Sequence, residues 1–212
     1  MLWPFNHFRR PRSSPAGSID AIYGMIVTQA REPSFYRDLG VPDTVEGRFD
    51  LLLLHLWVVL RRLRRTDGAM EPGSGPIREQ IQALAQGLFD RFCEDMDDNL
   101  REMGIGDLAV PLRMQAFGEA FYGRSKAYDL ALGRQDSGQD SGQSSEHGSE
   151  PAIDALAQAI DKNILCSGGP GHARALAAYA RAVATTLTAC DDTAILRGTW
   201  SFPLPAPRGN AA

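Results

Sequence analysis

The apolar residues between positions 42 and 65 recur at steps of three and four, which is the spacing of one face of an α-helix. Asp43 and Glu46 stand at the spacing of a capping box and predict that the helix begins there. Further apolar residues lie off the predicted core face, so the middle of this helix is apolar nearly all round and needs cover on several sides. The core face consists of Val45, Phe49, Leu52, Leu53, Leu56, Trp57, Leu60 and Leu63.

The same spacing recurs along much of the chain. Gly40 and Gly104 stand where predicted helical segments end, a position that favours glycine. No stretch alternates apolar and polar residues as a strand would. We therefore predict an all-α fold, a single-domain helical bundle of about six or seven helices. Besides the helix at 42–65, the predicted segments are helices at about 18–32, 76–103, 111–132, 151–165 and 172–189 and a single turn at 34–40.

Three segments are expected to contribute little to the bundle, which spans 18–190. Residues 133–150 contain no apolar side chain and repeat QDSG, which predicts a disordered linker before the last two helices. Residues 1–17 combine aromatic residues with arginines and contain no acid. This pattern is typical of a disordered or membrane-touching arm, or of a weak mitochondrial presequence. Residues 191–212 predict an irregular C-terminal tail.

Composition narrows the class of protein. The 212 residues are 43% hydrophobic, enough for one substantial core. A net charge of -4 argues against nucleic acid as the main partner, and no DNA binding is expected. Three widely spaced cysteines suit neither a disulfide framework nor a zinc site and indicate a reducing compartment. The longest apolar run is too short to span a bilayer, so we expect a soluble, cytoplasmic protein.

Candidate chemistry is sparse, and we expect neither an enzyme nor a bound cofactor or metal. No phosphate-binding glycine loop, nucleophile elbow or zinc motif occurs. The acidic residues Asp90, Glu94, Asp97 and Asp98 favour a solvated helix face, with Asp97 and Arg101 as an i,i+4 pair, over a metal site. His55 lies inside the apolar run; a hydrogen-bonded core histidine is favoured over a haem-binding or proton-handling one.

The predicted central helix ends in a cluster of arginines. Arg61, Arg62, Arg64 and Arg65 suit a helix C-terminus, whose dipole favours cations. The same four guanidinium groups could also bind anionic lipid or ribosomal RNA. Both interpretations remain open from the sequence, and the four arginines are the candidate membrane or ribosome contact.

Four segments carry a family resemblance: IYGMIV, FYRDLGVPDTVEGRFD, FCEDMDDNLREMGIGD and AFYGR, in this order. Together they closely resemble the ubiquinol-cytochrome c chaperone family from Ile22 to about Leu132, and the last two predicted helices resemble it more loosely. The short N-terminus departs from the mitochondrial pattern, and the 133–150 insertion leaves little to compare. We expect a bacterial member of the family.

The resemblance implies a non-enzymatic assembly factor for ubiquinol-cytochrome c reductase, respiratory complex III. Its implied client is newly made cytochrome b, with a small partner protein and a ribosome or anionic membrane surface as further contacts. The implied location is the cytoplasm or the cytoplasmic face of the inner membrane, or the mitochondrial matrix in a eukaryote. A small haem- or cofactor-handling helical module is the alternative function, and an enzyme with an unrecognised site is a third.

A chaperone for a hydrophobic membrane subunit needs exposed apolar surface. The apolar residues that lie off the core face of the central helix could provide part of it. The candidate client-groove residues are Leu51, Leu54, Val58 and Val59.

Overall fold

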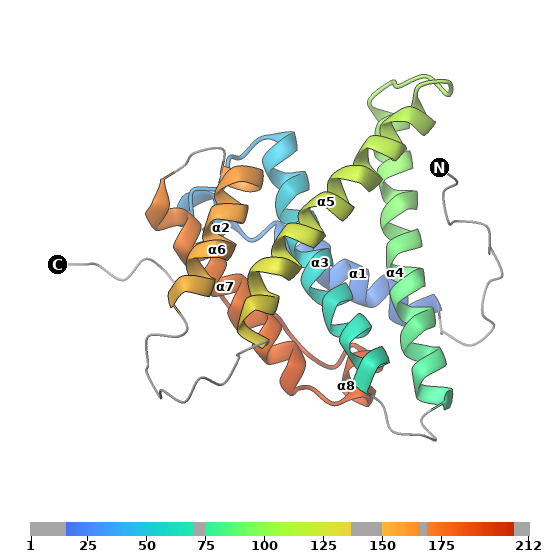
Figure 1. Ribbon diagram of the computed structural model, residues 1–212. Helices are drawn as coiled ribbons and strands as arrows, with labels where there is room; N and C mark the ends of the chain where they lie inside the picture. The colour runs from blue at the N-terminus through green and yellow to red at the C-terminus, as the bar shows by residue number, and fades with distance from the viewer. Residues whose placement is uncertain (1–15, 70–74, 137–149, 166–168, 206–212) are drawn as a thin grey trace, which may run out of the picture.

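The computed structural model describes residues 16–69, 75–136, 150–165 and 169–205 (Figure 1). Within these ranges every regular element is a helix, which confirms the predicted all-α bundle. The expected N-terminal arm lies almost entirely outside the described residues, as does most of the expected linker at 133–150. The elements are α1 (Ala16–Ala30), α2 (Pro33–Arg37), α3 (Val45–Ala69), α4 (Gly75–Glu102), α5 (Val110–Asp136), α6 (Glu150–Ile160), the π-helix η2 (Asp161–Leu165), α7 (Pro170–Ala189) and α8 (Asp192–Arg197).

Helix α3 is the centre of the bundle. It packs against α1, α4, α5, α7 and η2, and all ten residues from Leu51 to Leu60 are buried. This burial follows from its sequence, because a helix that is apolar on all sides is stable in water only when other elements cover it. The surrounding helices each cover only one part of α3.

The beginning of α3 differs in detail from the sequence-based prediction. Thr44, not Asp43, caps the helix, because its Oγ1 accepts a hydrogen bond from the Gly47 N–H at 3.1 Å. Asp43 instead accepts a hydrogen bond from Arg48 Nε at 2.7 Å. A Cβ atom at Gly47 would lie only 2.1 Å from the Pro42 carbonyl oxygen. The chain therefore enters α3 so tightly that only glycine fits at this position.

Helices α4 and α5 pack through aromatic side chains and also contact α3. The Phe49 and Phe117 rings lie 4.8 Å apart, and Phe89 and Phe121 lie 5.4 Å apart. Gly104 ends α4 with a φ of 79°, as its position in the sequence predicted. Met103, the last residue of the helix predicted at 76–103, follows the last turn of α4 and is exposed.

The C-terminal segment is more ordered than the expected irregular tail. Asp191 caps α8 by accepting a hydrogen bond from the Ala194 N–H at 2.8 Å, and Gly198 ends the helix with a φ of 65°. Trp200 is buried beyond it, and the Phe202 ring lies 5.3 Å from His55 in the core. A helix of six residues is too short to produce a periodic pattern, which is why the sequence did not predict it.

The close approach at the start of α3 gives a testable prediction. Gly47→Ala should destabilise the fold by about 1–3 kcal/mol, because the added methyl group collides with a backbone oxygen and outweighs alanine's better helix propensity. Gly24→Ala is the matched control, since nothing lies within 4 Å of a Cβ built at that exposed helical position. Urea denaturation followed by circular dichroism measures both changes. Equal stability of the two variants would contradict the tight entry into α3.

Candidate functional site

The arginine cluster at the end of α3 is divided between internal and external positions. Arg61 Nη1 and Trp57 Nε1 both donate to Asp129 Oδ1 on α5, each at 3.0 Å. Arg64 Nη2 donates to the other oxygen of this carboxylate at 3.2 Å. The Arg64 side chain is 46% exposed, whereas Arg61 is largely buried. One carboxylate on α5 thus anchors the basic end of α3.

Arg62 connects α3 to the C-terminal helices. Its Nε donates to the Leu187 carbonyl and its Nη2 to the Cys190 carbonyl, both at 2.8 Å, and Nη2 also donates to Asp192 at 2.9 Å. The two carbonyls lie at the end of α7, where the last carbonyl groups of a helix have no intrahelical N–H donor. With a side-chain exposure of only 11%, Arg62 acts as a cap for another helix.

These positions decide which arginines of the candidate membrane or ribosome contact can be reached from outside. Arg61 and Arg62 are engaged within the fold and cannot turn outward without breaking hydrogen bonds to α5, α7 and α8. Arg64 and Arg65 are exposed. The structure therefore reduces the surface part of the cluster from four arginines to two.

The candidate client-groove residues are covered by the protein's own helices. Leu51, Leu54, Val58 and Val59 are all buried beneath the elements that pack against α3, which are α1, α4, α5, α7 and η2. The expectation that they line an open groove is therefore corrected, because the helices around the middle of α3 cover them in this structure. A sequence pattern shows that a residue is apolar but not which neighbour covers it.

His55 is a fully hydrogen-bonded core residue. Its Nδ1 lies 2.8 Å from the Leu51 carbonyl oxygen, which only accepts, so this nitrogen carries the proton. Its Nε2 lies 2.9 Å from the Tyr179 hydroxyl, which donates to it, and Gln29 Nε2 donates to the same hydroxyl oxygen at 3.1 Å. Burial lowers the pKa of His55 to about 4. Both nitrogens are thus engaged in the fold, and neither is free to bind haem iron.

The acidic face of α4 makes structural contacts. Tyr23 on α1 donates a hydrogen bond to Asp95 at 2.9 Å, and Arg101 pairs with Asp97 at 2.6 Å, the i,i+4 pair that the sequence predicted. No group of three or more His, Cys, Asp or Glu side chains suitable for a metal occurs in the described part of the chain. The acidic residues of α4 therefore make separate contacts, one with α1 and one near the end of α4, and do not form a cluster.

A second charged pair lies between α3 and α5. Arg124 Nη2 contacts Asp50 Oδ1 at 2.8 Å, and burial raises the pKa of Asp50 to about 6 despite this partner. Because the folded pKa lies above the ordinary value, ionisation of Asp50 costs stability as the pH rises through about 6. Both residues belong to the segments that carry the family resemblance, and they join those segments in space.

Exposed apolar residues gather where α4 and α5 meet. Leu108 is 99% exposed and Leu112 is 70% exposed. Met103, a few residues earlier in the sequence, is also exposed. Figure 1 shows this connection at the top of the view, at the far end of the bundle from α8. We call these three residues the α4–α5 tip. The helical pattern of the sequence did not predict this tip, although two leucines lie in and beside a turn rich in glycine.

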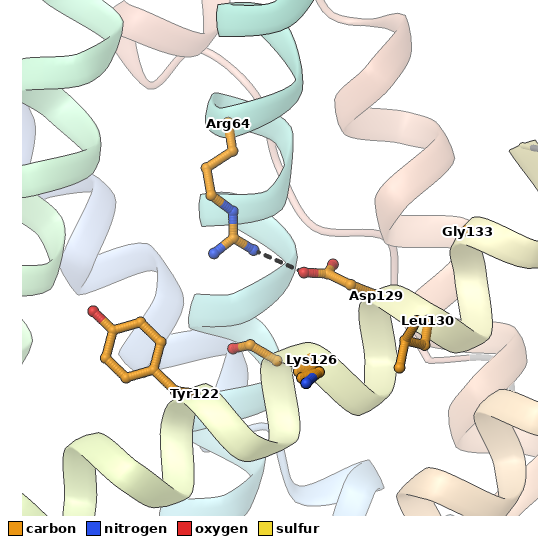
Figure 2. Close-up of a pocket in the computed structure, with 7 residues that line it drawn as sticks. Arg64, Tyr122, Lys126, Asp129, Leu130 and Gly133 are labelled. Carbon is orange, nitrogen blue, oxygen red and sulfur yellow. Dashed lines mark hydrogen bonds and ion pairs between the residues drawn. The ribbon is translucent and has the colours of Figure 1, made fainter. Parts of the chain in front are cut away.

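A cavity of about 580 Å³ lies beside the exposed part of the arginine cluster. Figure 2 shows Arg64 reaching from α3 toward Asp129, with Tyr122 and Lys126 on the preceding turns of α5. A second cavity of about 560 Å³ between α5 and α6 shares Leu130, which is 62% exposed. We call the first of these the α3–α5 cavity. It is lined by Arg64, Tyr122, Ser125, Lys126, Asp129, Leu130 and Gly133.

The hydrogen bonds of His55 predict a pH dependence that can be measured. The folded pKa lies below the ordinary value of 6.5, so His55 stabilises the fold at neutral pH and this contribution is lost as the pH falls from 6.5 to about 4. Imidazole ¹⁵N shifts should report the neutral Nδ1–H form down to about pH 4. Tyr179→Phe should raise the pKa by removing the donor to Nε2, whereas Tyr122→Phe should leave it unchanged. Titration of His55 near pH 6.5 in the native protein would contradict the observed contacts.

Comparisons with known proteins agree with the resemblance seen in the sequence. A family model described as ubiquinol-cytochrome C chaperone matches residues 37–140 and 143–202. The chain is also similar to the crystal structure of the Cbp3 homolog from Brucella abortus, with a TM-score of 0.69 and 34% identity over 88% of this chain and 89% of that chain. A comparison with curated proteins found no match.

The match extends beyond the segments that first carried the resemblance. It includes α6, α7 and α8, which were comparable only loosely as sequence, and most of the chain is covered in both comparisons. The chain belongs to the ubiquinol-cytochrome c chaperone family.

Proposed function

We propose that this protein is a non-enzymatic chaperone that binds newly made cytochrome b during assembly of ubiquinol-cytochrome c reductase. The observation that carries the proposal is the family match over 37–140 and 143–202, supported by similarity to a Cbp3 homolog over nearly the whole fold. No described helix is long and apolar enough to cross a membrane. The proposed site of action is the cytoplasmic face of the inner membrane, where a membrane-protein client would be inserted.

The α4–α5 tip is the surface that we propose for the client. A transmembrane subunit exposes apolar segments before it is inserted into the membrane. A chaperone that binds them must have apolar side chains that are not buried in its own core. Leu108 and Leu112 meet this requirement, whereas the apolar residues of α3 are covered. Two of the nearby acids, Asp97 and Asp107, are paired with Arg101.

The exposed arginines supply a second proposed contact. Arg64 and Arg65 remain accessible at the end of α3 and can bind an anionic surface, either a membrane or a ribosome. A small partner protein is a further proposed component, as the family resemblance implies.

Deletion of the gene in its native host tests the assembly role. Loss of the chaperone should lower the steady-state level of cytochrome b and of assembled complex III, because the unprotected subunit is degraded. Quantitative immunoblotting of complex III subunits and ubiquinol-cytochrome c reductase activity measure the effect, and the plasmid-borne gene should restore both. Normal levels and activity in the deletion strain would contradict the proposed function.

Site-specific photo-crosslinking tests the client surface separately. A photoreactive benzoylphenylalanine in place of Leu108 should form an adduct with cytochrome b during assembly, and the 99% exposed position should accept it without disturbing the fold. Thr185, an exposed residue on α7, is the matched control position and should form no adduct. Equal adducts from both positions, or none from Leu108 in a strain with normal complex III, would place the client elsewhere.

A further inference from the structure

The α3–α5 cavity has a chemistry that an apolar client does not need. Two cations, Arg64 and Lys126, and two hydroxyl groups, those of Tyr122 and Ser125, line it together. Arg64 comes from α3, and Figure 2 shows Tyr122 and Lys126 on α5. Ser125 is the residue before Lys126 on the same helix. Residues at i and i+4 lie on one face of a helix, so Tyr122 and Lys126 project from the same side of α5.

The positive charge in this cavity is incompletely neutralised. Asp129 is the one carboxylate in its lining, and both of its oxygens already accept hydrogen bonds, Oδ1 from Arg61 and Trp57 and Oδ2 from Arg64. Arg61 alone carries enough charge to neutralise this carboxylate. Lys126 has no hydrogen bond or ion pair within the described residues, and Arg64 uses only Nη2 there. The guanidinium keeps donors for another acceptor.

Ser125 provides an independent indication that the cavity binds a ligand. Ser125 is 4% exposed as a residue, and its Oγ has no hydrogen-bond partner among the described residues. A serine inside a helix commonly donates to the carbonyl four residues earlier, and Ser125 does not. A buried hydroxyl without a partner is costly, and few occur in native proteins. Because Ser125 lines the cavity, an acceptor bound there would satisfy it.

We propose that the α3–α5 cavity binds a phosphate group. Arg64 and Lys126 supply the charge, with the guanidinium fork suited to phosphate oxygens, and Ser125 and Tyr122 supply hydroxyl donors. The exposed Leu130 and the Tyr122 ring border the same cavity, so a ligand with apolar atoms next to its phosphate also fits. Both a phospholipid headgroup and a soluble phosphate compound have this chemistry. The site does not depend on the identity of the client.

Titration of the full-length protein with inorganic phosphate tests the site directly. With chloride replaced at constant ionic strength, ¹H–¹⁵N NMR should show saturable shifts confined to Arg64 and to α5 around Tyr122–Gly133. Arg64→Gln/Lys126→Gln should weaken phosphate binding by at least about tenfold, since two charged donors are removed. The control Arg113→Gln/Arg197→Gln removes two exposed arginines elsewhere and should leave the affinity unchanged. Lys126→Gln alone is the conservative variant, because it breaks no contact within the described residues.

Vesicle binding separates the two sources of phosphate. Protein that sediments with phosphatidylglycerol vesicles but not with phosphatidylcholine vesicles, and loses this in Arg64→Gln/Lys126→Gln but not in the control, binds a lipid headgroup. Saturable inorganic phosphate binding without sedimentation assigns a soluble phosphate ligand. Absence of both, or equal losses in the two double variants, would overturn the proposal, and deletion of the gene would still report on the assembly role.

Discussion

Helix α3 must be kept from water on all sides, and this requirement arranges the rest of the molecule. Ten consecutive buried residues, Leu51–Leu60, include eight Leu or Val side chains and Trp57. Each such side chain contributes about 1.5–3 kcal/mol to the stability of the fold when it is fully buried. Exposure of this segment to water would therefore destabilise the fold strongly. Helices α1, α4, α5 and α7 and the π-helix η2 each cover a different part of α3. The polar group inside this shell, His55, is tolerated because both of its nitrogens are hydrogen-bonded.

The basic end of α3 shows how one run of residues serves both the fold and the surface. Successive residues of a helix point about 100° apart, so neighbouring arginines face different elements. Arg61 therefore reaches α5 while Arg62 caps the end of α7, and Arg64 and Arg65 remain at the surface. The cluster that suggested a single contact with an anionic surface is half structural. Its exposed half, together with Lys126 and Ser125 on α5, borders the cavity for which we propose a phosphate ligand.

Helix α5 carries both surfaces that we propose to be functional. Leu112 lies in its first turn at the α4–α5 tip, and Lys126 lies fourteen residues later beside the α3–α5 cavity. At about 1.5 Å per residue the two positions are separated by about 21 Å along the helix. An apolar client at one position and a phosphate at the other can thus be bound at the same time. On these proposals, a membrane lipid held at the cavity would keep the client site close to the bilayer.

The sequence by itself determined the long helices, the central place of α3 and the family, because periodicity, capping glycines and motif order are local properties of the chain. It placed His55 in the core and paired Asp97 with Arg101, contacts within or near one helix. Only the tertiary structure decided which apolar and basic residues remain exposed. Leu51 and Leu108 are both leucines, but long-range packing buries the first and leaves the second in solvent. Arg62 likewise hydrogen-bonds to residues that lie 125 to 130 positions later in the sequence. A local sequence pattern cannot predict contacts at such a separation.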